Sequence, residues 1–381
     1  MMFFKGKKMK ICFISPEIFS WGIHGGFGYL TRLLGSKLAS RGHEVTVVTE
    51  RRDNQEKIEL LDGITVYGYP SFKRKSILPA APLARIVSSN YYRCTDADIF
   101  HSQAVSYNSL IAQKVVKEKT HIITLQDPYD YREWQKISKV DPSYRINTAF
   151  KCRMILDRKL LSSACKNAQA LYVQARFLAR KAKHLFNLDE LPPFLPNPVV
   201  VPNRSMRKAD EPTVCFLGRW DPQKRVELFF QLAKQHPDIK FIAMGRSHNP
   251  SKDLELRRKY GSIHNLLCTG FVSEHEKSVI LERSWALVNT SVREALPISF
   301  LEALAHETPI LSSENPDSLT SLYGCWVPDE NYRSGLEKIL DDESRLEKGR
   351  LGRRYVAETH EVEKVVDRHL EIYENLLESR L

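Results

Sequence analysis

The chain has 381 residues, of which 42% are hydrophobic and 27% are charged, and its formal net charge is +11. This length favours two domains over one, and the absence of an apolar run of about eighteen residues excludes a transmembrane helix. The seven cysteines include no Cys-x-x-Cys pair, and the first ten residues lack the long apolar core that is expected of a secretory signal. We therefore expect a reducing, cytoplasmic location without a disulfide framework.

The positive charge is concentrated in the first half of the chain. Residues 1–200 carry 31 Lys and Arg against 17 Asp and Glu, a balance of +14, whereas the remainder has a balance of −3. Such a surface is either solvated charge or a binding face for nucleic acid, an anionic membrane or an anionic acceptor. RNA-binding motifs with interleaved aromatic residues are absent, so we expect no nucleic acid and favour an anionic acceptor or peripheral contact with the inner face of the membrane. The segment 77–87, next to the basic cluster at 72–75, is either an amphipathic membrane-docking segment or ordinary packing.

The first part of the chain alternates apolar runs with helical patterns. KICFIS at 10–15 is suited to a buried parallel strand, and a glycine-containing turn follows it at 21–28. Leucines at helical spacing then predict a helix that Gly42 closes, and EVTVVT at 44–49 is the next strand. This strand–helix–strand unit is the start of a doubly wound sheet. The alternation continues with strands at 98–102, 121–125 and 170–174 and with helices near 107–118 and 148–165.

Six prolines between residues 191 and 212 mark an interdomain connection. The predicted N-terminal Rossmann-like domain covers 9–195, the linker 196–212, and the C-terminal Rossmann-like domain 213–360. Ligands of such sheets bind at the carboxyl ends of the strands, so both domains would aim their loops into a cleft between them. The second domain is predicted to contain strands at 213–218, 240–245, 266–270, 286–291 and 309–313 and helices at 225–235, at 274–283 and from Pro297; one long amphipathic helix at about 353–380 ends the chain.

Two glutamates eight positions apart, Glu294 and Glu302, lie around a predicted helix start. Pro297 suits the first turn of a helix, whose unpaired N–H groups and dipole favour a phosphate. A loop carboxylate at Glu294 can accept hydrogen bonds from sugar hydroxyls. Glu302 lies in an apolar run and needs polar partners, which a ribose would supply. Alternatively, Glu302 is a surface residue of an amphipathic helix and Glu294 interacts with the helix dipole.

A second polar stretch, GRWDPQK at 218–224, follows a predicted strand. Gly218 ends the strand, Arg219 follows it, and Lys224 lies near the next helix start. Two cations at these places would clamp a diphosphate, although either one alone is more simply an ordinary surface charge.

Together these stretches resemble the retaining glycosyltransferases of family 4 (group 1), which have the GT-B fold. GRWDPQK resembles the family's Gly-Arg…Lys motif, EALPISFLEALAHETPIL its Glu-x7-Glu motif, HGGFG at 24–28 its glycine loop, and FLPNPVVVP at 194–202 the segment that enters its linker. The resemblance covers nearly the whole chain. It implies an α/β architecture of two Rossmann-like, doubly wound parallel-sheet domains facing across a cleft, with a C-terminal helix at about 361–381 that packs back on the first domain.

The resemblance also implies an activity and roles for individual residues. The activity is transfer of a hexose-type sugar from a nucleotide-diphosphate sugar to a glycolipid, polysaccharide or small-molecule acceptor, with retention of configuration and with no metal or other cofactor. Arg219 and Lys224 would hold the donor diphosphate and stabilise the leaving group, Glu294 would contact the transferred sugar, and Glu302 would hold the ribose. The remaining implied positions are Gly218, Ala295, Leu296 and Pro297 on the donor side and Gly25 and Gly26 in the glycine loop.

The chain departs from the family pattern on the acceptor side. Gln126-Asp127 stands where many members have His-Asp, and Gln103 stands where a second histidine is common. Glutamine forms hydrogen bonds but does not shuttle a proton at neutral pH. His101 remains, either as a sugar-side residue or as a structural one. The candidate acceptor-side residues are therefore Gln126, Asp127 and His101.

Two other function classes fit parts of the sequence. An NAD-dependent oxidoreductase would use the first strand–glycine–helix turn and Glu50, but residues 22–28 do not have the Gly-x-Gly-x-x-Gly spacing. A non-catalytic protein that binds a sugar nucleotide or a nucleic acid is the other alternative. It would be disfavoured if Glu294→Gln or Lys224→Ala abolished activity while keeping the fold. Asp-Ala-Asp at 96–98 resembles the metal motif of another glycosyltransferase fold, but it precedes a buried strand and is more simply a turn.

Overall fold

The computed structural model describes residues 8–21, 25–52, 55–70 and 80–380, with backbone only at 80–86. The basic cluster at 72–75 and most of segment 77–87 therefore lie outside the described side chains. The chain divides into two compact units. The first unit comprises Met1–Pro128, Asn147–Pro198 and Glu363–Leu381, and the second comprises Tyr129–Ile146 and Val199–Val362.

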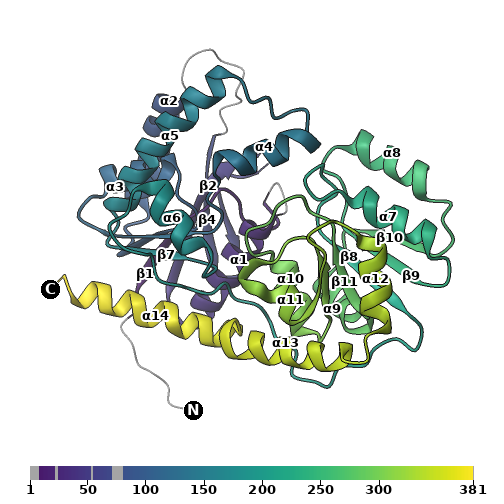
Figure 1. The fold of residues 1–381 in the computed structure, drawn as a ribbon. Coiled ribbons are helices and arrows are strands. Elements are labelled where there is room, and N and C mark those ends of the chain that lie inside the picture. The colour runs from purple at the N-terminus through teal and green to yellow at the C-terminus, as the bar shows by residue number, and fades with distance from the viewer. Residues whose placement is uncertain (1–7, 22–24, 53–54, 71–79, 381) are drawn as a thin grey trace. The chain divides into compact units, whose positions relative to one another are not determined.

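The sheet of the first unit has seven strands in the order β3-β4-β2-β1-β5-β6-β7 (Figure 1). All neighbours are parallel except the edge pair β3 and β4, which forms an antiparallel hairpin. Asp62 and Gly63 turn this hairpin with positive φ angles of 50° and 80°, as an Asp-Gly hairpin turn requires. The central strands are buried along nearly their whole length, as expected for parallel strands covered on both faces. The strands are β1 (Lys10–Ile14), β2 (Glu44–Arg51), β3 (Ile58–Leu61), β4 (Ile64–Pro70), β5 (Ile99–Ser102), β6 (Thr120–Leu125) and β7 (Ala170–Val173).

Helices alternate with these strands, so the doubly wound α/β fold class predicted from the sequence is confirmed. Helix α1 ends where predicted, and Gly42 follows it with φ +91°, a conformation that suits a residue without a Cβ. The helices of this unit are α1 (Gly26–Ser40), α2 (Ala80–Cys94), α3 (Tyr107–Val115), α5 (Thr148–Lys166), α6 (Leu178–Phe186) and nearly all of α14 (Val362–Glu378).

The second unit is built around a six-stranded sheet in the order β10-β9-β8-β11-β12-β13, with every pair parallel. Its core is rich in aromatic side chains, among them Phe216, Phe229 and Phe241. The strands are β8 (Thr213–Leu217), β9 (Lys240–Met244), β10 (Leu266–Gly270), β11 (Ala286–Asn289), β12 (Ile310–Ser312) and β13 (Gly324–Trp326). The helices are α4 (Tyr131–Val140), α7 (Val226–Gln235), α8 (Pro250–Tyr260), α9 (Glu274–Arg283), α10 (Ile298–Ala305), α11 (Leu319–Leu322), α12 (Tyr332–Asp341) and α13 (Arg345–Thr359), with a 3-10 turn η1 (Pro316–Ser318) before α11.

The single long helix predicted at about 353–380 is wrong, because two helices, α13 and α14, occupy this region. The break at His360 and Glu361 has a local cause. The carbonyl of His360 accepts a hydrogen bond from the N–H of Val199 at 2.8 Å, and the N–H of Val362 donates to the carbonyl of Val199 at 3.0 Å. A short β-bridge therefore replaces the helical hydrogen bonds at the point where the chain leaves the second unit.

Helix α14 packs within the first unit through polar and aromatic contacts. Glu363 accepts hydrogen bonds from Lys37 at 2.7 Å and from Arg41 at 2.5 Å, both on α1. Burial is nearly complete for Tyr373, which contacts His101 at the end of β5. Among the described residues, no helix is both long enough and apolar enough to cross a bilayer.

Residues 129–146 group with the second unit although they interrupt the first unit's part of the sequence. The predicted boundaries assigned them to the N-terminal domain. Helix α4 in this segment buries Ile137, and its Glu133 pairs with Arg293 of the second unit. This grouping depends on contacts between residues about 160 positions apart in sequence, which local sequence patterns do not reveal.

Candidate functional site

The two polar stretches singled out in the sequence meet at one edge of the second sheet. Strands β8 and β11 are parallel neighbours, so the loops that follow them, 218–225 and 290–297, leave from the same edge. The N–H of Val292 donates to the carbonyl of Gln223 at 3.0 Å, and the Gln223 amide donates to the carbonyl of Arg293 at 3.0 Å. The first loop therefore supports the second at the positions next to Glu294.

Lys224 and Glu294 form an ion pair at the centre of this edge. Lys224 Nζ lies 2.5 Å from Glu294 Oε1, and the Glu294 side chain is only 8% exposed. Asn289 and Ser291 donate hydrogen bonds to the same oxygen, at 3.2 and 2.5 Å. Burial raises the pKa of the Glu294 carboxyl, but Lys224 and the two hydrogen bonds outweigh it, so the net pKa is lowered. Glu294 is therefore an ionised, oriented acceptor at neutral pH.

Asn289 and Ser291 are partners that the sequence interpretation did not name. It extended the strand to 291, whereas β11 ends at Asn289, and the polar residues that follow turn toward Glu294. The missed signal was the polar Asn-Thr-Ser ending of an otherwise apolar run. Glu314, after β12, is a second neighbouring carboxylate, because its Oε2 accepts a hydrogen bond from the Glu294 N–H at 3.4 Å.

Arg219 lies at the more open part of the same loop. Its side chain is 44% exposed, and its guanidinium is 3.3 Å from Asp221. Asp221 also accepts a hydrogen bond from the backbone N–H of Lys224 at 3.1 Å, so this carboxylate contacts Arg219 and holds the loop backbone at Lys224. Gly218 follows β8, and its carbonyl lies very close to Gly245, which follows β9. A Cβ on Gly245 would lie 1.9 Å from the Gly218 carbonyl oxygen, and Gly245 has φ +120°, so glycine is required at Gly245.

Helix α10 begins at Ile298 rather than at Pro297. Pro297 is the N-cap, because its ψ of 136° is extended and not helical. Ala295 and Leu296, which precede it, are buried. The first amides of a helix have no partner within the helix, so the start of α10 can accept an anion next to Lys224 and Glu294.

Glu302 lies on α10 and is buried, with its Oε1 2.6 Å from Lys277 Nζ of α9. Burial raises the pKa of Glu302, and Lys277 opposes that rise without cancelling it. The expectation that a carboxylate in this apolar run needs a partner is confirmed, since Lys277 is that partner in the chain itself. Lys277 was missed because it belongs to another helix, 25 residues earlier.

A half-buried lysine holds the C-terminal end of α10. Lys208 Nζ donates to the carbonyl of His306 at 2.9 Å and to the Thr308 hydroxyl at 2.8 Å. Burial lowers the pKa of Lys208 from 10.5 to about 7. In the unfolded chain its pKa returns to the ordinary value, so between pH 7 and about 10 the unfolded state binds a proton that the folded state does not. This residue therefore makes the free energy of unfolding rise with pH across that window.

Replacing Lys208 with methionine should remove this pH dependence. We expect the stability of Lys208→Met to compare best with that of the wild type near pH 7. As the pH rises to 10 the wild type gains stability and the variant does not, so the free energy of unfolding of the variant minus that of the wild type should fall by about 2–4 kcal/mol. Urea unfolding of both proteins at several pH values measures the difference. Parallel pH profiles would contradict the assignment of a lowered pKa to Lys208.

The glycine-loop candidates lie at the start of α1 in the first unit. Gly25 is the extended N-cap of α1, and Gly26 is the first helical residue. A Cβ on Gly25 would lie 2.3 Å from Glu17 Oε1, and the same oxygen accepts a hydrogen bond from the Gly28 N–H at 3.2 Å. A carboxylate of the chain therefore lies against this helix start, where an anionic ligand group would also bind. Glu17 was not predicted.

Two of the acceptor-side candidates are held by protein partners. His101 is fully buried, and its two ring nitrogens lie 2.7 Å from the Tyr373 hydroxyl and 2.8 Å from the Thr124 hydroxyl. Burial lowers the pKa of His101 well below its usual value. These contacts favour the structural alternative for His101.

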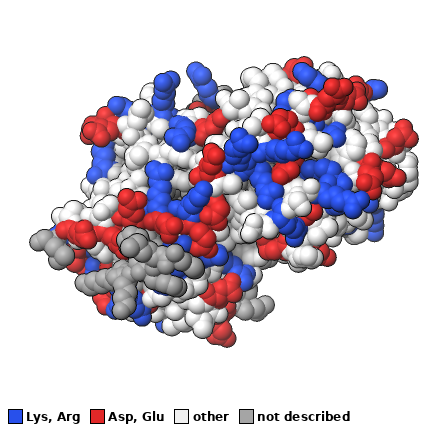
Figure 2. Space-filling model, turned by 90° about the horizontal axis from the view of Figure 1, so that it is seen from below, with Lys and Arg blue, Asp and Glu red and all other residues white. Residues whose placement is uncertain are grey.

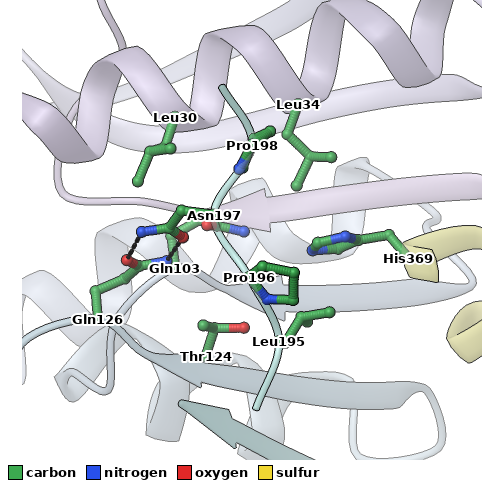
Figure 3. Close-up of a pocket in the computed structure, with 10 residues that line it drawn as sticks. All are labelled: Leu30, Leu34, Gln103, Thr124, Gln126, Leu195, Pro196, Asn197, Pro198 and His369. Atoms are coloured by element: carbon green, nitrogen blue, oxygen red, sulfur yellow. Dashed lines mark hydrogen bonds between the residues drawn. The ribbon is translucent and has the colours of Figure 1, made fainter. Parts of the chain in front are cut away.

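Gln126 forms a reciprocal amide pair with Asn197, with both hydrogen bonds at 2.8 Å (Figure 3). Asn197 belongs to the proline-rich segment, so this pair ties that segment to the end of β6. The pair borders a small cavity, also lined by Gln103 and Thr124, that has room for about one water molecule. Asp127 follows at the end of β6 and is half-buried.

The residue before Glu294 anchors the same loop to helix α4. Arg293 is 2% exposed, its Nε donates to Glu133 at 2.9 Å, and its guanidinium lies 4.0 Å from the centre of the Tyr129 ring. Glu133 also accepts a hydrogen bond from the Asp130 N–H, which caps the start of α4. Segment 129–146 thus contributes to the support of the Glu294 loop.

Two family models match consecutive parts of the chain. The model described as Glycosyltransferase Family 4 matches residues 24–203, and the model described as Glycosyl transferases group 1 matches residues 202–347. A curated relative, the glycosyltransferase 1 domain-containing protein 1 of Xenopus tropicalis, is 27% identical over 104 residues. That match spans 27% of this chain and only 30% of the relative's length.

Solved structures show the same fold. Sucrose-phosphate synthase of Thermosynechococcus elongatus has a TM-score of 0.76 at 17% identity, over 98% of this chain and all of that chain. HepE of Anabaena, solved with UDP and glucose, has a TM-score of 0.68 at 12% identity, over 96% and 99%. WaaG, a glycosyltransferase of lipopolysaccharide biosynthesis, has a TM-score of 0.68 at 16% identity, over 95% and 99%. These neighbours have the GT-B fold, which the two parallel-sheet units share.

Proposed function

The chain belongs to the family 4 (group 1) glycosyltransferases, and from that membership we propose that it transfers a hexose-type sugar from a nucleotide-diphosphate sugar to an acceptor hydroxyl with retention of configuration. The second unit binds the donor, and the basic first unit binds the acceptor, which is a glycolipid, a polysaccharide or a small molecule. The observation that carries this proposal is the half-buried Lys224–Glu294 pair beside the start of α10. The cation and the carboxylate, which we propose contacts the sugar, lie on loops that follow adjacent strands, and the carboxylate's loop leads into the start of α10.

Each group has a part in the reaction. The bond between the sugar's anomeric carbon and the diphosphate oxygen breaks, and negative charge develops on that oxygen. Lys224 and Arg219 stabilise this charge from fixed positions, as electrostatic catalysis requires. A new bond forms between the acceptor oxygen and the same face of the anomeric carbon, and the acceptor proton passes to the leaving phosphate.

The carboxylates orient the donor. Glu294 accepts hydrogen bonds from hydroxyls of the transferred sugar, and Glu302 accepts them from the ribose while Lys277 balances its charge. The amides around Leu296 and at the start of α10 bind the distal phosphate. Because protein cations neutralise the diphosphate, we propose that the reaction needs no metal.

Release of nucleoside diphosphate from UDP-, GDP- and ADP-sugars in the presence of EDTA tests the proposal. Turnover with one nucleotide class, on addition of acceptor extracts, supports a metal-independent transferase. No turnover in EDTA with recovery on adding Mg²⁺ would contradict metal independence but not the family function.

Arg219→Ala is expected to lower the rate of transfer about tenfold or more while leaving the fold intact. The side chain is 44% exposed, so its loss removes charge from the site and leaves no cavity in the core. The comparison is Arg207→Ala, which removes an exposed arginine of the same unit from a loose pair with Asp210. Full activity in Arg219→Ala, or equal losses in both variants, would contradict the role of Arg219.

One observation favours a second candidate, a protein that binds a sugar nucleotide without turning it over. Gln126 occupies the position where the family often has histidine, and its amide is held by Asn197. Binding of a sugar nucleotide without any release of nucleoside diphosphate would favour this alternative.

A further inference from the structure

Arg225, the residue before α7, has a backbone conformation that arginine rarely adopts. Its φ of 47° and ψ of 44° are left-handed, and its side chain makes no hydrogen bond to the first turn of the helix. Left-handed backbone is strained for a residue with a Cβ, and a helix N-cap favours serine, threonine, asparagine, aspartate or glycine. Neither the backbone nor the helix start therefore accounts for an arginine at this position.

The guanidinium of Arg225 joins three loops at one edge of the second sheet. Its Nε donates to the carbonyl of Thr290 at 2.8 Å and its Nη2 to that of Ser291 at 3.4 Å, both in the loop after β11. Its Nη1 and Nη2 also donate to the two carboxylate oxygens of Glu330, at 2.8 and 2.7 Å. Strands β8, β11, β12 and β13 are parallel neighbours, so the loops that contain Arg225, Ser291 and Glu330 leave the sheet at the same edge.

The residues that Arg225 binds also hold the two groups of the proposed donor site. Thr290 is fully buried, and its hydroxyl donates to the carbonyl of Lys224 at 2.8 Å, with the carbonyl of Arg225 at 3.1 Å. The hydroxyl of Ser291 donates to the Glu294 carboxylate at 2.5 Å. Arg225 thus fixes the two residues that hold the backbone of Lys224 and the side chain of Glu294.

An ion pair alone would not mark a functional position in this protein. Figure 2 shows Lys and Arg side chains lying among Asp and Glu on the face that it displays, and exposed pairs of this kind contribute little to stability. The Arg225–Glu330 pair differs, because Arg225 binds both carboxylate oxygens and its side chain is only 17% exposed. These hydrogen bonds hold the pKa of Glu330 below its ordinary value, so the pair is formed at neutral pH.

We propose that Arg225 is a positioning residue for sugar transfer, which holds the loops of Lys224 and Glu294 in register with each other. Each nitrogen of its guanidinium already donates within the protein, so Arg225 acts through these loops and not on the donor itself. A small displacement of catalytic groups slows a reaction strongly, so the loss of this contact should appear in the rate. The inference rests on the proposed function.

Two substitutions, Arg225→Lys and Arg225→Gly, test the proposal. Lysine keeps the charge but lacks the planar fork of donors, and glycine adopts left-handed backbone without strain while removing the guanidinium. We expect each variant to lower kcat about tenfold or more and to change the Kd for the free nucleoside diphosphate less than about threefold. Amide hydrogen exchange at residues 290–294 should become about tenfold faster, because the loop loses its anchor.

The matched control is Arg353→Lys on α13. Arg353 donates to Glu307 at 2.9 Å and to the carbonyl of Arg204 at 2.9 Å, so it is also an arginine that binds a glutamate and the backbone. Glu307 follows the C-terminal end of α10, whereas Glu294 precedes the start of that helix. We therefore expect Arg353→Lys to keep the wild-type kcat and the wild-type exchange at residues 290–294.

Thermal unfolding checks that the variants remain folded. A lower kcat with nearly unchanged nucleotide affinity in the Arg225 variants, and a wild-type kcat in Arg353→Lys, supports the positioning role. A wild-type kcat in both Arg225 variants, or equal losses in Arg225→Lys and Arg353→Lys, would overturn it. A loss of nucleotide affinity as large as that of Lys224→Ala would also overturn it, since Arg225 would then bind the phosphates directly.

Failure of the proposed function gives a different result. Wild-type protein that transfers no sugar would contradict the proposed function, whereas hydrogen exchange reports on the loop without any transfer. Faster exchange at residues 290–294 in the Arg225 variants alone supports the hold of Arg225 on this loop. Unchanged exchange in those variants would overturn it.

Discussion

Replacing Lys224 with alanine is expected to lower the rate of sugar transfer by about 10²–10³-fold, the largest loss of any single substitution in this chain. The ammonium lies 2.5 Å from Glu294 and is the most buried cation of the proposed diphosphate site. Its removal takes away charge stabilisation of the leaving group. It also leaves Glu294 buried without its cation, which raises the pKa of that carboxyl toward the value that burial favours.

The same substitution should reduce stability, because breaking a buried ion pair costs about 3 kcal/mol. Steady-state kinetics and urea unfolding of Lys224→Ala measure the two effects. The double variant Lys224→Ala/Glu294→Gln separates them, since it removes both charges and should recover stability while staying inactive. A Lys224→Ala enzyme with wild-type rate would show that the cation takes no part in transfer, and recovery of rate in the double variant would show that the loss was one of folding.

Glu294→Gln is expected to lower the rate of transfer by about 10²-fold while changing the affinity for the free nucleoside diphosphate little. Glutamine keeps the size of the side chain and can still bond with Ser291 and Asn289, but it is a weaker acceptor for sugar hydroxyls. The carboxylate is proposed to contact the sugar and not the nucleotide, so the loss should appear in the rate and not in nucleotide binding.

Glu302→Gln is the comparison for this result. Glu302 is proposed to hold the ribose, so its change should weaken nucleotide binding more than it slows the bound complex. Isothermal titration with the nucleoside diphosphate, alongside the kinetics, distinguishes the two glutamates. If Glu294→Gln weakened nucleotide binding as much as Glu302→Gln did, the separate roles assigned here would be wrong.

Much of the fold could be predicted because its signals are local. The strands at 10–14, 213–217 and 240–244 are apolar after their first residue, and parallel strands covered on both faces have that composition. The break between α13 and α14 could not be predicted, because Val199, some 160 residues earlier, supplies the competing hydrogen bonds. The grouping of residues 129–146 with the second unit has the same kind of cause.

In the candidate site, the motif residues could be predicted from the sequence but their partners could not. Lys224, Glu294 and Glu302 belong to short motifs whose order in the sequence already places them after strands or at a helix start. Their partners come from elsewhere in the fold: Lys277 from another helix and Glu314 from a neighbouring strand end. Spacing in the sequence predicts which groups a ligand would contact, whereas burial and distant ion pairs determine how those groups are held.

The most direct test of the central claim is thermal unfolding of the wild-type protein and of Lys224→Ala with UDP-, GDP- and ADP-sugars in the presence of EDTA. A ligand that binds only the folded state raises the unfolding midpoint by mass action. We predict a raised midpoint with one nucleotide class for the wild type and a much smaller shift for Lys224→Ala. An unchanged wild-type midpoint with every nucleotide sugar, or equal shifts in both proteins, would contradict a donor site at the Lys224–Glu294 pair.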